Sequence, residues 1–379
     1  MDFSNEFEIL RPYNNSEVVP AIQRMMKHPF LKPVLAYVYP DKDIDQVIVD
    51  FSNLTTVEAF QDFFSQHAVR EVVRKTSTGL TFSGLEQLDN TKPYLFIANH
   101  HDIVLDSAIM QVILYENNHK TTQITFGSNL MKDPMIVDIG KLNKMFTFYR
   151  GGTKMETYKH AVLHSAYIRH VLTEKKDSVW IAQRDGRTKD GDDRTQSGLI
   201  KMLAAGRKDH RDALMDLNIV PICISYEYIP CDIQKVREMY ISLTQEYIKQ
   251  PNEDFNSIVG GIVGYKGGVN VCFGQPINVE LQKIDAHIGM NELADYVVEL
   301  IDKQIHINYT LRAINYVAFD IVNNTSEHLG QKYTDQEKAD FITYVNKKVA
   351  STEITDSKLN AMFIEMYAKP VSNFLNISK

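Results

Sequence analysis

The sequence predicts an α/β fold, in which a mixed, largely buried sheet is flanked by helices, with helical additions at both ends. Short apolar runs alternate with helical stretches between residues 76 and 305, a pattern typical of buried strands joined by helices. Residues 1–75 and 306–379 carry helical periodicity instead. The chain has 379 residues, of which 44% are hydrophobic, so it can bury a large core. We therefore expect three parts: an N-terminal helical region (1–75), an α/β domain (76–305) and a C-terminal helical region (306–379).

The elements follow in order along the chain. Ser16 and Glu17 open a helix over 18–26, and residues 57–74 carry a second amphipathic pattern. The strands are expected where apolar, β-prone residues run together, at 94–97, 123–126, 146–149, 178–182, 219–225 and 268–273.

The C-terminal region has two clear helix signals. Thr334 and Glu337 have the spacing of a capping box before a helix over 338–349. Residues 356–368 form a last helix. Neither an internal repeat nor a low-complexity linker interrupts the chain.

Charge and cysteine content narrow the class of protein. The formal net charge is -7, so the chain offers no basic excess for nonspecific binding to nucleic acid, and we expect no nucleic-acid partner. Cys223, Cys231 and Cys272 are scattered without metal-ligand spacing, as expected of reduced thiols in a cytosolic protein.

The sequence also bears on where the protein resides. The N-terminus is acidic and lacks a signal-peptide core, and no stretch reaches the roughly 18–20 apolar residues of a spanning helix. We expect a cytoplasmic protein, in solution or peripheral on the inner face of the membrane. Residues 18–39 mix basic and apolar residues as an interfacial helix does, although Pro29 and Pro33 interrupt them. The alternative is that the same apolar residues pack on the core.

The first candidate site follows the run 94–97, where the chain reads Ala-Asn-His-His-Asp-Ile-Val-Leu-Asp. A histidine near an aspartate at a strand-to-helix turn is suited to general-base catalysis, because the carboxylate fixes one tautomer and stabilises the imidazolium. Residues five apart on a helix lie about 140° apart, so His101 reaches Asp106 only from the turn before the helix, with Asp102 as N-cap. His100 is the competing base. A capped turn or a His-His-Asp metal site are the alternatives.

The second candidate site is the polar loop after the run 178–182. Arg184, Gly186, Arg187, Thr188 and Lys189 place guanidinium groups, a hydroxyl and flexible backbone close together, which suits an anion. The aspartates of the loop balance the charges of its basic residues. The alternative to an anion-binding site is an ordinary polar surface loop.

The third candidate is Arg150, which ends the run 146–149 and precedes two glycines. Ligands of open α/β sheets bind at the carboxyl ends of the strands, so Arg150 can face the same crevice as the histidine turn. A surface arginine is the alternative.

These features occur in one order, and in that order the chain resembles the glycerolipid acyltransferase family, which includes the 1-acylglycerol-3-phosphate and glycerol-3-phosphate acyltransferases. The family has an Asn-His-x4-Asp block, a block ending in Phe-x-x-Arg, a Glu-Gly-x-Arg block and a Val-Pro block. The matching segments here are 99–106, 140–150, 186–189 and 220–222, and 271–277 resembles the family's last strand and turn.

The resemblance implies a glycerolphosphate-acyltransferase-like fold and an O-acyltransferase of phospholipid biosynthesis. The donor would be acyl-CoA or acyl-ACP as co-substrate, with no cofactor and no metal, and the acceptor a hydroxyl of a glycerol-phosphate or lyso-lipid at a membrane surface. The histidine deprotonates that hydroxyl, Asp106 orients the histidine, and Arg150, Arg187 and Lys189 hold the acceptor's phosphate. Backbone amides at the helix start after Asp102 are candidates for stabilising the oxyanion.

Two registers of the histidine block remain open. With His100 as the base, Asp106 comes one residue late; with His101, the x4 spacing is kept but a second histidine separates it from Asn99. Carboxylate spacing favours His101. In the third block Arg184 stands where the family has Glu. A metal-dependent hydrolase using His100, His101 and Asp106, and a catalytically silent lipid-binding member of the family, are the alternative functions.

Overall fold

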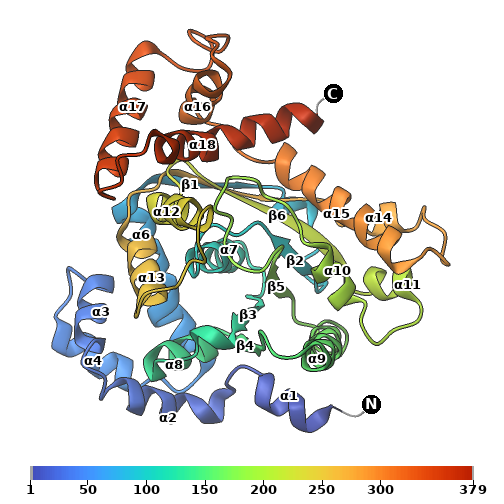
Figure 1. Ribbon diagram of the computed structural model, residues 1–379. Helices are drawn as coiled ribbons and strands as arrows, with labels where there is room; N and C mark the ends of the chain where they lie inside the picture. The colour runs from blue at the N-terminus through green and yellow to red at the C-terminus, as the bar shows by residue number, and fades with distance from the viewer. Residues whose placement is uncertain (1–2, 378–379) are drawn as a thin grey trace.

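The computed structural model describes residues 3–377 and contains a seven-stranded mixed sheet flanked by helices (Figure 1). The strand order is β1-β7-β6-β2-β5-β3-β4. All neighbouring strands pair in parallel except β6 and β7, which are antiparallel. The predicted fold class, a mixed sheet with helical additions at both ends, is confirmed. The strands are β1 (Ser77–Ser83), β2 (Leu95–Ala98), β3 (Gln123–Gly127), β4 (Met145–Phe148), β5 (Val179–Ala182), β6 (Ile219–Tyr226) and β7 (Gly267–Phe273).

All six expected strands are present, within a residue or two of the predicted ends. The strand that the sequence did not reveal is β1, which pairs with β7 at the edge of the sheet. Its sequence, Ser-Thr-Gly-Leu-Thr-Phe-Ser, is mostly polar, and it buries none of its side chains fully. An exposed edge strand needs no apolar run, and so it gives no hydrophobic signal.

The central strand β2 shows how the sheet divides the core. Leu95 and Ile97 pack with α9, α10 and α15 on one face, whereas Phe96 and Ala98 pack with α6 and α7 on the other. Successive side chains of a strand point to opposite faces, so four consecutive apolar residues bury both. Helices that fill these layers and connect the strands are α7 (Leu105–Glu116), α8 (Pro134–Leu142), α9 (Lys154–Thr173), α10 (Ser197–Leu203), α11 (His210–Met215), α12 (Asp232–Ser242), α13 (Glu253–Val263), α14 (Asn278–Leu281) and α15 (Met290–Ile307).

The N-terminal region is helical, as expected, but is more divided than the sequence indicated. The stretch 57–74 is not one helix: a π-helical segment, Gln61–Gln66, lies between α5 and α6. The helices are α1 (Ser4–Leu10), α2 (Asn15–Met25), α3 (Leu31–Val38), α4 (Ile44–Ser52), α5 (Val57–Phe60) and α6 (His67–Thr76).

Most apolar side chains of residues 18–39 pack on the protein, although Val19, Met26 and Phe30 are exposed. Ile22, Met25 and Leu35 are buried in one cluster with residues of α8. Arg24 reinforces this contact through an ion pair with Asp138 of α8 at 2.6 Å. Of the two readings of this segment, packing on the core is therefore the one that the structure supports.

The C-terminal region consists of α16 (Ala313–Asn323), α17 (Asp335–Ala350) and α18 (Ser357–Ile377), which share an apolar cluster with residues of α12. The predicted capping box is confirmed: the Thr334 hydroxyl accepts from the Glu337 amide, and the Glu337 carboxylate accepts from the Thr334 amide. The last helix runs nine residues beyond the predicted end at 368. No helix within residues 3–377 is both long and apolar enough to cross a membrane.

The glycine-rich stretch 260–268 contains the end of α13. Gly261 packs closely against Asp102, in the turn between β2 and α7. A Cβ atom at position 261 would come within 2.0 Å of Asp102 Oδ2. The glycine lets a helix backbone pass close to a buried carboxylate.

The two adjacent glycines of α13 give a matched test. Alanine normally stabilises a helix interior by up to about 1 kcal/mol over glycine. Gly260→Ala should therefore be neutral or stabilising, since its Cβ would meet only Cys231 Sγ at 3.5 Å. Gly261→Ala should destabilise the protein by about 1–3 kcal/mol, because Asp102 and α13 must move apart. Urea unfolding of both variants measures this, and equal effects would refute the close contact.

Candidate functional site

The Asp106 carboxylate organises the turn between β2 and α7. Its Oδ2 accepts hydrogen bonds from His100 Nδ1 at 2.9 Å and from the backbone amides of His101 and Asp102 at 2.7 and 2.9 Å. Its Oδ1 accepts from the Tyr226 hydroxyl at 2.8 Å. A buried carboxylate with four donors is held in one position, and so is the chain that wraps around it.

His100 has the geometry of a general base. Its Nδ1 is bound to Asp106, which fixes the tautomer with the proton on Nδ1 and the lone pair on Nε2. The His100 side chain is 12% exposed, whereas that of His101 is 2% exposed. The His100 ring also lies edge-on to Trp180, with the ring centres 5.9 Å apart. Only His100 of the two combines a carboxylate partner with access to solvent.

The expected pairing of the His101 ring with Asp106 is wrong. His101 Nε2 lies 3.1 Å from Asp193 Oδ2 and 3.2 Å from Asn99 Nδ2, and only its backbone amide reaches Asp106. The expectation assumed that the turn is short and the helix begins at residue 103. In fact residues 101–104 form a non-helical bend and α7 begins at Leu105, so one more residue fits between histidine and aspartate.

Asp102 caps the helix start from within this bend. It is not the N-cap residue that the sequence predicted, because α7 begins at Leu105 and Val104 holds the N-cap position. Its Oδ1 nevertheless accepts from the amides of Val104 and Leu105 at 2.9 and 2.8 Å. Those two amides are therefore occupied, and the expectation that they stabilise an oxyanion is not supported. Burial, and the nearby charge of Asp106, raise the pKa of Asp102.

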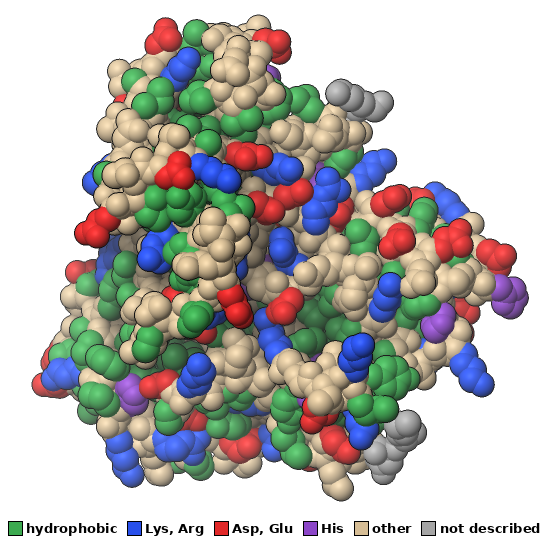
Figure 2. Space-filling view, in the orientation of Figure 1, with side chains coloured by type: hydrophobic (Ala, Val, Ile, Leu, Met, Phe, Trp, Pro, Cys, Tyr) green, Lys and Arg blue, Asp and Glu red, His purple; other side chains and the backbone are tan. Residues whose placement is uncertain are grey.

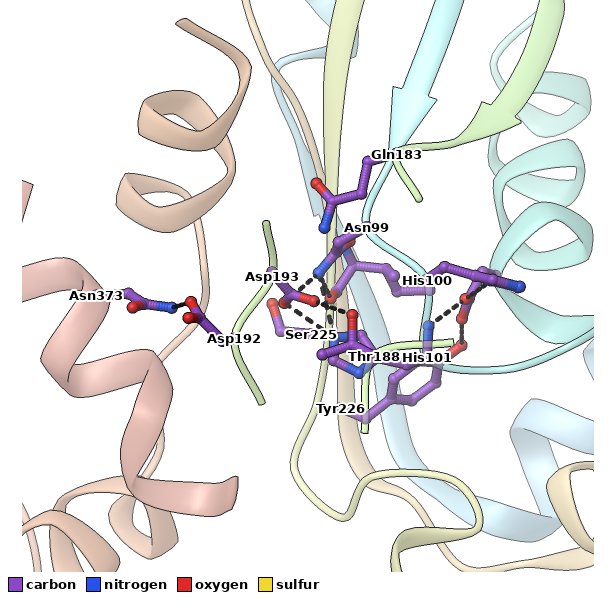
Figure 3. Close-up of polar contacts among 12 residues, drawn as sticks. Asn99, His100, His101, Gln183, Thr188, Asp192, Asp193, Ser225, Tyr226 and Asn373 are labelled. Carbon is purple, nitrogen blue, oxygen red and sulfur yellow. Dashed lines mark hydrogen bonds and ion pairs between the residues drawn. The ribbon is translucent and has the colours of Figure 1, made fainter. Parts of the chain in front are cut away.

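A second histidine–carboxylate pair lies beneath the first and connects the turn to the polar loop (Figure 3). Asp193 Oδ2 accepts from Asn99 at 2.9 Å and is paired with His101, and its Oδ1 accepts from the Thr188 hydroxyl at 2.7 Å. The Thr188 amide donates to the His100 carbonyl at 2.7 Å. Thr188, expected to bind substrate, thus has its hydroxyl and amide engaged in holding the loop against the turn.

Both buried carboxylates remain ionised at neutral pH. Burial raises the pKa of Asp106, but the hydrogen bond and charge of His100 and the charge of His101 outweigh it, so the net shift is downward. For Asp193, burial is again opposed by His101, Asn99 and Thr188, which lower its pKa to about 2. Each anion is stabilised by donors rather than by solvent.

The loop 183–196 is held from the far side by α15 and α18. His306 of α15 lies with its Nε2 2.8 Å from the Asp193 carbonyl oxygen, and Asn373 of α18 donates to Asp192 at 3.1 Å (Figure 3). Lys369 of α18 also pairs with Asp192 at 3.6 Å. Because these contacts come from residues more than 100 positions away, the C-terminal helices help to place the candidate site.

The basic residues expected to bind an anion are at the same edge of the sheet but differ in availability. Lys189 pairs with Glu238 at 2.5 Å, and Arg150 pairs with Asp185 of the loop. Arg187 donates to Ser257 of α13 at 3.3 Å. Among the described residues, Arg184 Nε and Arg187 Nη1 are buried without a hydrogen-bond partner. Gly186 has a φ of +74°, which the loop's reversal requires.

Lys235 of α12 is a residue that the sequence analysis missed. It is fully buried and donates from Nζ to the His101 carbonyl oxygen at 2.7 Å. Burial, and the charge of Arg187, lower its pKa to about 8. A lysine within a helix gives no signal of this role, whereas Asp193, also missed, stands inside the loop that the sequence singled out.

The metal-site alternative finds no support in the arrangement of side chains. The rings of His100 and His101 turn to different carboxylates, Asp106 and Asp193. Nowhere in residues 3–377 do three or more His, Cys, Asp or Glu side chains form a group that could hold a metal ion.

Residues 79–225 match the family model described as Acyltransferase, a segment that contains the whole histidine turn and the loop 183–196. No curated protein matches the sequence. Among solved structures the chain is similar to the 1-acyl-sn-glycerophosphate (LPA) acyltransferase PlsC from Thermotoga maritima. The identity is 12% and the TM-score 0.38, over 76% of this chain and 92% of that chain.

The buried Lys235 gives a pH-dependent test of the site. The folded protein holds its proton less tightly than the unfolded chain, so the unfolded state binds more protons between about pH 8 and 10.5. Wild type should therefore gain stability relative to Lys235→Met as the pH rises from 8 to 10.5, by up to about 3 kcal/mol. Urea unfolding at a series of pH values measures the difference in unfolding free energy between the two proteins. Both contain the same buried tyrosines, so the contributions of those tyrosines cancel in the difference.

The control is Lys303→Met, which removes one positive charge at an exposed position of α15. A wild-type minus Lys235→Met difference that is flat across this pH range would show that Lys235 does not lose its proton as the geometry requires.

Proposed function

We propose that this chain transfers a fatty acyl group from an acyl thioester to a hydroxyl of a glycerol-phosphate or lysophospholipid, a proposal that the match of residues 79–225 to the Acyltransferase family model supports. The observation that carries the proposal is the His100–Asp106 pair, with Nδ1 on the carboxylate and a partly exposed ring. The roles of individual residues below are part of the proposal.

His100 acts as the base in the first step. Its Nε2 takes the proton of the acceptor hydroxyl as the oxygen attacks the thioester carbonyl, and the ionised Asp106 stabilises the imidazolium. The tetrahedral intermediate then breaks its carbon–sulfur bond. The imidazolium returns the proton to the departing thiolate, which leaves an ester, a free thiol and neutral His100.

The acceptor's phosphate would be held by Arg187, with Arg184 beside it. Arg187 already contacts α13 through Ser257, and its Nη1 has no partner within the described residues. A guanidinium with unused donors can bind a phosphate oxygen. Lys189 and Arg150 would have to leave Glu238 and Asp185 to contribute, so we assign them a lesser part.

We further propose that α13 brings the protein to a lipid surface. Phe255, Val259 and Val263 recur at helical spacing, and all three are exposed, the last to 56%. Ile248 and Tyr265, at either end of the helix, are exposed as well. The same helix contacts Arg187 and Asp102, so a lipid entering along it arrives beside the histidine turn.

The catalytic assignment is tested by acyl transfer from palmitoyl-coenzyme A and palmitoyl-acyl carrier protein to glycerol 3-phosphate and lysophosphatidate. His100→Ala and Asp106→Asn should lower turnover by roughly 10²–10⁴-fold, since the base or its orientation is lost. His101→Ala should lower stability more than turnover per folded molecule, because its ring is bound to Asp193.

Melting temperatures of the three variants separate loss of fold from loss of the base. Full activity of His100→Ala together with an inactive, folded His101→Ala would reverse the assignment. A folded wild type with no transfer from either donor would favour the catalytically silent, lipid-binding reading.

Membrane association is tested with vesicles of phosphatidylglycerol and phosphatidylethanolamine. The double variant Val259→Asp/Val263→Asp should bind vesicles on the order of tenfold less, because two charges replace exposed apolar side chains. Val279→Asp/Ile307→Asp, which changes two exposed apolar residues elsewhere, is the matched control. Equal binding by both double variants would exclude α13 as the contact surface.

A further inference from the structure

A cavity of about 740 Å³ lies away from the histidine turn, between α9, α10 and the segment that follows α10. Figure 2 shows a hollow at this place, with hydrophobic side chains inside it and basic side chains around it. The function proposed above makes no use of this cavity.

The rim of the cavity is cationic. Lys154, Lys201, Arg207 and Lys208 line it, and no Asp or Glu does, although the chain as a whole carries a net charge of -7. Arg207 is balanced by Asp209, but the three lysines have no ion-pair partner among the described residues. Unbalanced positive charge around a hollow favours an anionic ligand.

The floor is formed by aromatic rings. The rings of Phe148 and His164 stack with centres 4.0 Å apart, and those of Tyr149 and His160 lie 4.9 Å apart. Burial, and the charge of His160, lower the pKa of His164 to about 4, so its ring is neutral and accepts from the Tyr149 amide at 3.1 Å. The floor therefore suits a flat ring, while the rim suits phosphate.

The position of the cavity in the sheet limits which substrate can reach it. Phe148 and Tyr149 are at the carboxyl end of β4, the same edge at which β2 carries the histidine turn (Figure 1). The order β2-β5-β3-β4 puts three strand spacings, about 14 Å, between them. The phosphate of a glycerol-phosphate is too close to the reacting hydroxyl to span this distance, but the nucleotide of coenzyme A is joined to its thioester by the long pantetheine arm.

We propose that this cavity binds the phosphorylated adenosine end of a coenzyme A thioester, with the adenine on the aromatic floor and the 3′-phosphate at the lysine rim. The assignment rests on the proposed acyl transfer and makes coenzyme A the carrier. An acyl carrier protein has no exposed ring for the floor, since its pantetheine is attached to a protein surface.

The first test is binding, which does not depend on turnover. Isothermal titration with coenzyme A should give an affinity on the order of tenfold weaker for Lys201→Ala/Lys208→Ala than for wild type. The control variant is Lys303→Ala/Lys358→Ala, which removes two exposed lysines far from the cavity and should bind as wild type does. 3′-Dephospho-coenzyme A, which lacks the phosphomonoester, should bind both double variants and wild type with similar, weak affinity.

The second test is kinetic. The cavity variant should show a raised KM for palmitoyl-coenzyme A, and an unchanged rate with palmitoyl-pantetheine, which has no nucleotide. Unchanged coenzyme A affinity in Lys201→Ala/Lys208→Ala overturns the proposal whether or not the protein transfers acyl groups. Loss of glycerol 3-phosphate binding instead would assign the cavity to the acceptor, and loss of turnover with palmitoyl-acyl carrier protein alone would assign it to that protein; either result also overturns the proposal.

Discussion

The hydrogen-bonded burial of Asp106 is the interaction on which the site depends. A carboxylate removed from water is costly unless donors replace the solvent, and here a ring nitrogen, two amides and a tyrosine hydroxyl do so. Those donors come from the turn itself and from β6, so satisfying the anion also determines the path of the chain between β2 and α7. The position of His100 is a consequence of that path rather than of helix geometry.

The two neighbouring histidines differ in their carboxylate partners and in their exposure to solvent. His101 is enclosed with Asp193 and holds the turn to the loop 183–196, whereas His100 keeps one ring nitrogen near solvent. The loop is in turn fixed by α15 and α18. The proposed base is thus supported by a second histidine–carboxylate pair, which is fully buried and helps to hold it in position.

The surroundings of the turn offer separate places for each part of the proposed reaction. The guanidinium of Arg187 lies next to α13, whose apolar face is exposed. The basic cavity lies three strands away at the same edge of the sheet. If both proposals hold, acceptor and donor would approach His100 from different sides, and the hydroxyl and the thioester would meet without competing for one anion site.

The sequence by itself determined the fold class, six of the seven strands, the capping box at Thr334 and the block in which a histidine pairs with Asp106. These features depend on neighbours along the chain: apolar runs, helical spacing and capping residues are local. The edge strand β1 gave no signal, because it buries too little to need an apolar sequence.

Only the tertiary structure showed which histidine ring pairs with Asp106, and it is that of His100 rather than that of His101, which residue spacing favoured. Spacing measures distance along a regular helix, and residues 101–104 are a bend whose path is set by contacts with Tyr226, Asp193 and Lys235, which lie 92 to 134 positions away in the chain. The same holds for Arg150, Thr188 and Lys189, whose residue types were visible while their partners were not. Residue types and their spacing can be read from the sequence. Which charged side chains pair with one another depends on how distant segments of the chain pack together.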